Sequence, residues 1–195
     1  MSGFTAVGYF LLSMFFSIVN ILLWARFGLR YFRVSPLHPA AQTIITFTTP
    51  MIKPLERLFK SSNTRVHRYD WACLSMIIIV DILKFTLLGV LFLGQFPTWI
   101  ILPVYVLADL IIAPCNLLFY AILIRVIMSW VNPGWRNPLA EIIYLITEPL
   151  LYWARRKVPP ISGLDFSPFI IMIGLKVVTL FTSASVASPF ILNPE

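Results

Sequence analysis

Four charged residues stand inside apolar stretches of this 195-residue sequence, and their chemistry is the first question that it raises: Asp81, Lys84, Asp109 and Lys176. Charged side chains within a membrane are costly, and they usually form pairs or mark a path for ions or protons. Asp81 and Lys84 are three positions apart, within pairing distance on one helix face. Two interpretations remain open: structural ion pairs that fix helix packing, or an ion or proton path.

Motifs of catalysis are missing from the sequence. It contains no nucleophile–base set, no Gly-rich phosphate loop, no HExxH and no paired-cysteine site. Cys73 and Cys115 stand in apolar stretches as small hydrophobic residues, and His38 and His67 are isolated. We therefore expect no catalytic residue, no cofactor and no metal site.

The composition indicates an integral membrane protein. Hydrophobic residues make up 59% of the chain and charged residues 12%, whereas soluble domains carry about a quarter charged residues. A membrane span needs about 20 mostly apolar residues. The four candidate spans are Phe4–Trp24, Trp71–Leu93, Pro103–Val131 and Phe166–Phe190. The first has no basic start and no evident cleavage site, so we expect it to be its own insertion signal.

The basic residues predict the orientation of the spans. The formal charge is +7, and 13 of the 15 lysines and arginines fall in the two long segments that join spans one to two and three to four, counting Arg125 at the end of span three. The N-terminus, the 94–102 turn and the C-terminal tail hold none. The positive-inside rule explains this asymmetry better than a nucleic-acid partner does. We expect both long loops in the cytoplasm and both termini outside.

An internal repeat divides the chain. The pairs that match at a shift of 99 residues are Arg26 with Arg125, Pro39 with Pro138, Thr48 with Thr147, Pro50 with Pro149, and Arg57 with Arg156. A shift of 95 then aligns Asp70 with Asp165 and Asp81 with Lys176. Each unit has two spans, so both units point the same way. The predicted fold is all-α, with four transmembrane helices in two parallel repeats, 1–94 and 103–195, joined by a short external turn, 95–102.

In each repeat, the sequence pattern also predicts a cytoplasmic amphipathic helix. In 137–157 one face carries Glu141, Tyr144, Glu148, Tyr152 and Arg155. The face of the first copy carries Gln42, Ile45, Thr49, Lys53 and Glu56. This pattern is typical of a helix in the membrane interface, its apolar side toward the acyl chains. Arg155, Arg156 and Lys157 suit the helix C-terminus and anionic lipid headgroups.

A proline interrupts each amphipathic helix. Pro50 and Pro149 remove one backbone hydrogen bond each, so we expect a bend or break near Thr48 and Thr147, whose hydroxyls could cap the restarted helix. We expect a bent helix on the membrane surface. A re-entrant hairpin remains the alternative, and it requires a backbone buried in protein.

Other polar residues have expected structural roles. Asp70 and Asp165 precede spans, where they could act as N-caps or pair with Arg26 or Arg125. The two arginines end their spans and should extend to lipid headgroups.

The intramembrane residues raise a second set of expectations. Asp81 and Lys176 stand at similar depths and could meet across the repeat interface, as an alternative to Asp81 with Lys84. Asp109 stands near the outer start of its span. Asn20 and Asn116 could form hydrogen bonds between helices.

The second repeat carries a recognisable set of residues. They are Trp130, Pro138, Thr147–Glu148–Pro149, Arg155–Arg156, Pro159 and Gly163–Leu164–Asp165–Phe166–Ser167–Pro168. This set closely resembles the YggT family of bacterial inner-membrane proteins, called YLMG in plastids, in its two-repeat form. The first repeat departs from it, with TTP in place of TEP and HRYDWAC in place of GLDFSPF.

The resemblance implies a non-enzymatic protein of the bacterial inner membrane, in which the termini that the basic residues place outside would be periplasmic. Its family has been linked to osmotic-stress tolerance with potassium uptake, to division or nucleoid and thylakoid organisation, and to cytochrome b6 maturation in plastids. It implies a membrane scaffold or an assembly or stress-tolerance factor; the alternative is a small channel or transporter component for potassium or osmolytes. Anionic lipids, a membrane or cytoplasmic protein and a second copy are the partners to consider. The intramembrane charges and the TEP and Arg155–Arg156 residues are candidates for structural or partner contacts.

Overall fold

The computed structural model describes residues 3–58, 70–93, 101–131, 137–157 and 165–191. Within these ranges the chain is all helical, as predicted. The helices are α1 (Gly3–Tyr31), α2 (Pro39–Leu58), α3 (Trp71–Leu88), the short π-helix η1 (Gly89–Leu93) that continues α3, α4 (Ile101–Val131), α5 (Pro138–Lys157) and α6 (Ser167–Ile191). Most of the predicted 95–102 turn lies outside the described residues.

Among the described residues, four helices are long and apolar enough to cross a membrane, at the positions of the four predicted spans. They are α1, α3 together with most of η1, α4 and α6. The first is longer than expected and continues past Trp24 to Tyr31. It ends where Arg33 adopts a left-handed backbone conformation, with a φ of 55°. There the N–H of Val34 donates to the carbonyl of Leu29, a bond that satisfies a carbonyl of the last helical turn.

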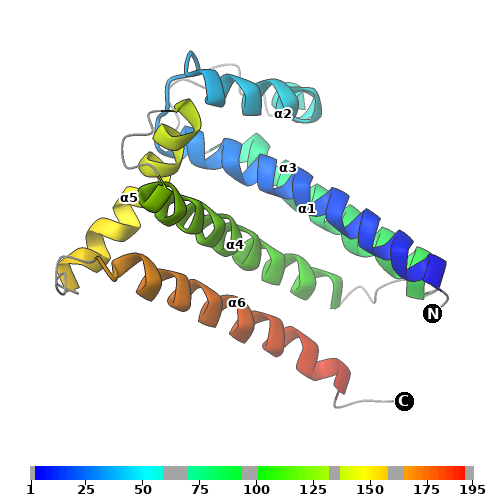
Figure 1. Cartoon of the computed structure of the whole chain (residues 1–195). Coiled ribbons are helices and arrows are strands. Elements are labelled where there is room, and N and C mark those ends of the chain that lie inside the picture. The colour runs from blue at the N-terminus through cyan, green and yellow to red at the C-terminus, as the bar shows by residue number, and fades with distance from the viewer. Residues whose placement is uncertain (1–2, 59–69, 94–100, 132–136, 158–164, 192–195) are drawn as a thin grey trace.

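The spanning helices pack in a row rather than in a ring. α3 packs against α1, α6 packs against α4, and α4 also contacts both α1 and α3. Helix α4 therefore lies between the α1–α3 pair and α6 (Figure 1). Along the helix axes, the start of α1 and the end of α6 lie at the same end of the helix bundle (Figure 1).

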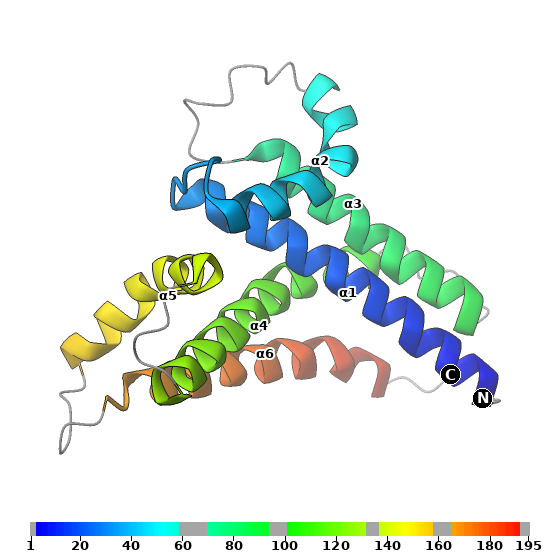
Figure 2. The ribbon, with the colours of Figure 1, turned by 45° about the horizontal axis from the view of Figure 1, so that its top comes forward.

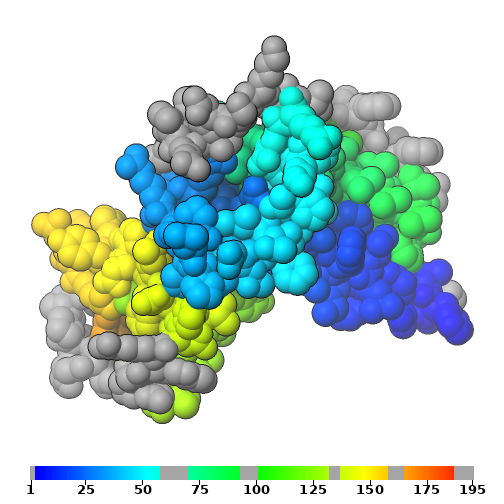
Figure 3. Space-filling view, turned by 90° about the horizontal axis from the view of Figure 1, so that it is seen from above, coloured from blue at the N-terminus to red at the C-terminus, as the bar shows by residue number. Residues whose placement is uncertain are grey.

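Helices α2 and α5 lie at the opposite end of the helix bundle, away from the start of α1 and the end of α6. We call these two helices together the platform (Figures 1 and 3). Figure 2 shows each of them bent, with halves that run in different directions. Pro50 and Pro54 lie inside α2 and Pro149 inside α5. A proline in a helix interior lacks the N–H for one backbone bond and crowds the preceding turn, which explains the bends.

Two apolar clusters attach the platform to the spanning helices. In the first, Ile52 of α2 packs with Leu23 of α1 and with Cys73 and Ile77 of α3. The second joins α1, α2 and α5 through Leu29, Ala40, Ala41, Ile142 and Ile146. Large apolar side chains elsewhere on the spans remain exposed, and α6 is the clearest case, with Ile173, Leu180 and Phe181. Such outward apolar surfaces are typical of helices that face lipid.

Two isoleucines of α3 differ in their burial, so their substitution tests this packing. Ile77 is fully buried, whereas Ile79 is 45% exposed. We expect Ile77→Ala to lower the free energy of unfolding by about 2–5 kcal/mol, because the surrounding helices cannot close the cavity. Ile79→Ala should cost less than about 1 kcal/mol, because its side chain packs on few neighbours. Unfolding of the purified protein in mixed micelles measures both, and equal losses would contradict the packing.

Candidate functional site

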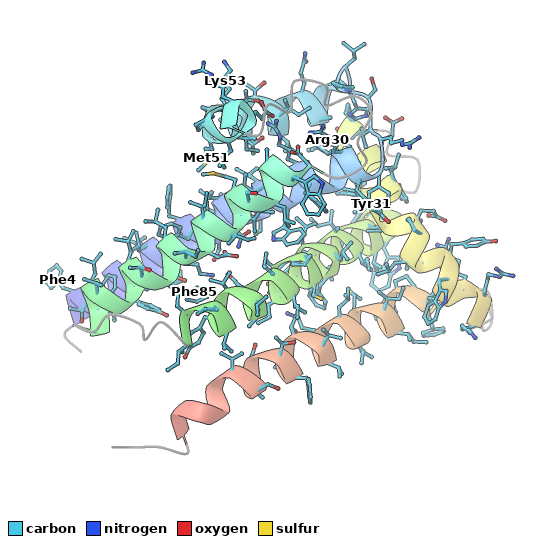
Figure 4. All side chains as sticks on the ribbon, turned by 180° about the vertical axis from the view of Figure 1, so that it is seen from behind. Phe4, Arg30, Tyr31, Met51, Lys53 and Phe85 are labelled. Carbon is cyan, nitrogen blue, oxygen red and sulfur yellow. The ribbon has the colours of Figure 1, made fainter. Side chains whose placement is uncertain are left out.

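The platform end of the molecule gathers the cationic side chains. Figure 4 places Arg30, Met51 and Lys53 at this end, and Phe4 and Phe85 toward the other. Arg155 and Arg156 of α5 belong to the same end. The candidate site is therefore the junction between the platform and the spanning helices beneath it.

Arg125, near the end of α4, forms the centre of the junction in the second half. Its side chain is only 11% exposed. One Nη atom donates to Thr147 Oγ1 at 2.8 Å, and the other lies 2.5 Å from Glu148 Oε2. Its guanidinium carbon also lies 4.4 Å from the centre of the Tyr144 ring. The Thr147 hydroxyl donates in turn to the carbonyl of Ile143 at 2.6 Å, so its oxygen is free to accept from the arginine.

Arg26, at the corresponding position of α1, makes the same kind of junction with α2. It donates to Thr48 Oγ1 at 3.0 Å and to Thr49 Oγ1 at 3.1 Å, and its second Nη lies 3.1 Å from Glu56 Oε1. The Thr48 hydroxyl donates to the carbonyl of Ile44 at 2.7 Å. We call these two arrangements the arginine clamps.

The clamps correct two expectations. Arg26 and Arg125 turn onto the bent helices instead of extending to lipid headgroups, because buried threonine hydroxyls and partly exposed glutamate carboxylates there satisfy a guanidinium. Thr48 and Thr147 do not cap a restarted helix: their hydroxyls bond to carbonyls four residues earlier, and the helix continues through the proline. Such back-bonding itself bends a helix.

A second ion pair in each half reaches the start of the next span, from α1 in the first half and from α5 in the second. Arg30 lies 2.6 Å from Asp70 in the first half, and Arg155 lies 2.7 Å from Asp165 in the second. The aspartates therefore pair with Arg30 and Arg155, and not with Arg26 and Arg125. Arg155 also lies 3.0 Å from Glu148, so the second half has one continuous series of charges from Arg125 to Asp165.

Both aspartates also bond to the beginning of a helix, as expected for acidic residues at this place. Asp70 is the N-cap of α3 and accepts the N–H of Cys73 at 3.1 Å. Asp165 stands two residues before Ser167, the first residue of α6, and accepts its N–H at 3.0 Å. Each carboxylate thus holds a helix N-terminus and an arginine together.

The charges of the clamp change the acidity of its carboxylates. The hydrogen bond from Arg125 lowers the pKa of Glu148 below its ordinary value, with a smaller contribution from Arg155 and against the opposing effect of burial. Burial by itself would raise the pKa of Asp165, but hydrogen bonds from Arg155 and Ser167 outweigh it and lower the pKa. Both groups are therefore anionic at neutral pH.

The predicted polar face of α5 forms a shallow, open groove of about 600 Å³. It is lined by Glu141, Tyr144, Leu145, Glu148, Pro149 and Tyr152. The opposite side differs from the expectation, because Ile142, Ile146 and Leu151 are buried against the protein instead of facing acyl chains. The apolar stripe of α5 therefore serves to seat the helix on the rest of the chain.

One contact between the halves was missed in the sequence, where His38 looked isolated. Its Nε2 lies 2.8 Å from Glu141 Oε2, so the starts of α2 and α5 meet. The alignment of Pro39 with Pro138 identifies the two helix starts as equivalent but does not show that they touch, so the sequence holds no direct signal for this contact.

The intramembrane charges form two separate groups. Asp81 accepts a 2.8 Å hydrogen bond from Asn20, and Lys84 lies 2.6 Å from Asp109. The expected meeting of Asp81 with Lys176 does not occur, because α4 lies between α3 and α6.

Asp81, Lys84 and Asp109 make up the first group, and Lys176 with its own neighbours makes up the second. It donates to Asn116 at 3.3 Å, and its Nζ lies 4.4 Å from the centre of the Phe119 ring. Asn116 thus bonds between helices as Asn20 does. In the part of the chain that the structure describes, no cluster of three or more His, Cys, Asp or Glu side chains is placed to hold a metal ion.

Comparison with known proteins places this arrangement in context. The sequence model of the CCB3/YggT family matches residues 5–91 and 104–186. The chain is 33% identical over 180 residues to the "uncharacterized protein in proC 3'region" of Vibrio alginolyticus, covering 86% of this chain and 88% of that protein. It is 29% identical to "uncharacterized protein YggT" of Escherichia coli K12, covering 88% of this chain and 86% of that protein. No solved structure matches.

The threonine of a clamp can be tested by removing its hydroxyl. Thr147→Val keeps the shape but leaves Arg125 without one buried acceptor, so we expect a loss of about 1–3 kcal/mol of unfolding free energy. Thr46→Val is the matched control, because the exposed Thr46 hydroxyl bonds only within α2; it should change stability by less than about 0.5 kcal/mol. Denaturation of both purified variants in micelles makes the comparison, and a neutral Thr147→Val would contradict the clamp.

The lowered pKa of Glu148 predicts a pH-dependent contribution to stability. A carboxylate whose pKa is lowered by folding stabilises the protein fully above its unfolded pKa, about 4.3 for glutamate, and loses that contribution as the pH falls through the folded value. Glu148→Gln should therefore be less stable than the wild type at pH 7, and the difference should shrink below about pH 4. Thermal midpoints across pH test this, and a difference that stays constant would contradict it.

Proposed function

Because this chain belongs to the CCB3/YggT family, we propose that it is a non-enzymatic membrane protein whose platform holds another protein at the membrane surface, as a scaffold or as an assembly or stress-tolerance factor. The family membership is shown by the match over residues 5–91 and 104–186. The curated relatives in Vibrio alginolyticus and Escherichia coli are named as uncharacterized, so the role rests on the physical features of the chain.

The proposed arrangement in the membrane has two parallel repeats, each with two spans and one bent interfacial helix. Both halves have the same order of helices, a long span, a bent helix and a second span. The clustering of arginines and lysines at the platform end supports a cytoplasmic platform in the inner membrane and periplasmic termini.

The observation that carries the proposal is that the platform is firmly attached below and open above. The arginine clamps and the apolar clusters attach it to the spanning helices, and the His38–Glu141 contact joins its two helices to each other. Its outer side exposes Trp153 to 66% and Tyr152 to 59%, beside the exposed Arg156 and Lys157. Aromatic rings next to cations suit a surface that meets anionic headgroups or an acidic protein segment.

The alternative, a channel or transporter component for potassium or osmolytes, receives less support from the geometry. Lys84 is paired with Asp109, and α4 separates Asp81 from Lys176. The charged residues therefore form two local groups instead of one continuous path through the membrane.

The partner surface can be tested by photocrosslinking in native membranes. A photoreactive residue at position 153 should give defined crosslinks, and Arg156→Gln with Lys157→Gln should reduce them severalfold, because the charges beside the crosslinker are removed. Arg155 stays unchanged, since it is part of the clamp. Lys53→Gln on α2 is the control, because Lys53 is exposed but lies on the other bent helix.

Two outcomes would contradict the proposal. Crosslinks that remain unchanged in the Arg156–Lys157 variant would show that this surface is not the docking surface. Potassium or osmolyte flux through liposomes that contain the purified protein, absent from empty liposomes, would favour the transport alternative.

A further inference from the structure

The charges buried between α1, α3 and α4 do not balance. Lys84 and Asp109 lie 2.6 Å apart and neutralise each other, and both side chains are largely buried. Asp81 lies close enough to feel the charges of both. With both aspartates ionised, the three groups together carry one net negative charge.

Burial makes this excess charge costly. Asp81 is fully buried, and its neighbour Asn20 is 3% exposed. Asn20 Nδ2 donates to Asp81 Oδ1 at 2.8 Å, which satisfies one carboxylate oxygen. An isolated carboxylate in a medium of low dielectric constant is strongly disfavoured unless a counter-charge is present.

Two oxygen atoms at this position have no partner. Asp81 Oδ2 and Asn20 Oδ1 are both buried without a hydrogen-bond donor. They belong to two residues that already bond to each other across α1 and α3. Lys84 cannot fill the role of counter-ion, because its ammonium group lies against Asp109 and near the Phe85 ring, 5.0 Å from its centre.

We propose that Asp81 and Asn20 bind one alkali-metal cation between α1 and α3, with the Asp109 carboxylate as the neighbouring anionic group. Carboxylate and amide oxygens are the ligands that hard cations prefer. A single positive charge would neutralise the group and give both unpartnered oxygens a partner. Because these side chains belong to three helices, the ion would also hold α1, α3 and α4 together.

This inference is independent of the proposed scaffold function. It concerns a bound ion that stabilises the helix row, and it requires neither a transport path nor a protein partner. A chain that binds the ion but forms no crosslinks would support the cation site and contradict the scaffold function.

The test uses the purified full-length protein in nanodiscs of neutral lipid. Binding of ²²Na⁺ is measured by scintillation proximity at constant ionic strength, with N-methyl-D-glucamine chloride as the replacement salt and KCl as the competitor. We expect saturable binding of one ion per chain, and a thermal midpoint that rises with NaCl concentration because the ion binds the folded state. Asp81→Asn should abolish both effects.

Three further variants keep the test decisive. Asn20→Leu retains the carboxylate but loses one oxygen, so it should weaken binding by about tenfold or more. Asp109→Asn leaves Lys84 to compensate Asp81 and should also remove binding. Lys176→Met changes an intramembrane charge on the far side of α4 and should bind the ion as the wild type does.

The proposal is overturned if the wild type binds no ²²Na⁺ that NaCl or KCl displaces, or if Asp81→Asn binds as much as the wild type. A thermal midpoint that depends on pH and not on either cation would also overturn it, since a proton would then neutralise the carboxylate.

Discussion

The contact on which the rest of the structure depends is the one between a buried arginine at the end of a spanning helix and the threonine that precedes a helix-bending proline. Arg125 reaches Thr147 and Glu148, and Arg26 reaches Thr48, Thr49 and Glu56. The proline bends the helix, the threonine hydroxyl satisfies a carbonyl of the preceding turn, and the arginine fastens the bend to the span. Without this contact, α2 would be held to the spanning helices by its apolar contacts, and α5 by its apolar contacts and the Arg155–Asp165 ion pair.

In both halves an arginine near the end of a span is paired with a carboxylate of the bent helix, but the carboxylate stands at a different position in each half. In the second half Glu148 links Arg125 to Arg155, and Arg155 continues to Asp165 at the start of α6. In the first half a threonine occupies the position of that glutamate, so the clamp carboxylate comes from Glu56 and the aspartate pairs with Arg30 instead. The first half therefore keeps a clamp carboxylate although Thr49 stands where the second half has Glu148.

The sequence was sufficient for the features that depend on local composition: the four apolar helices, the proline bends of α2 and α5, and the aspartates at the helix starts. It was insufficient where the answer depends on which helices touch. Aligning Asp81 with Lys176 identifies equivalent positions, but equivalence does not imply contact, and α4 separates them. Likewise, Arg26 and Arg125 near the ends of their spans suggested contact with lipid headgroups, but the bent helices supply the acceptors Thr48 and Thr147. His38 looked isolated because its partner, Glu141, is 103 residues away in the sequence.

The clamp is tested most directly by a distance measurement across it. Spin labels at Val131, exposed at the end of α4, and at Trp153, exposed on α5, report how firmly α5 is held to the span. A narrow distance distribution in the wild type that broadens in Arg125→Leu is the predicted result, because the arginine is the polar link between the two helices. A distribution that stays equally narrow in the variant would show that apolar packing alone seats the platform, and would contradict the central claim.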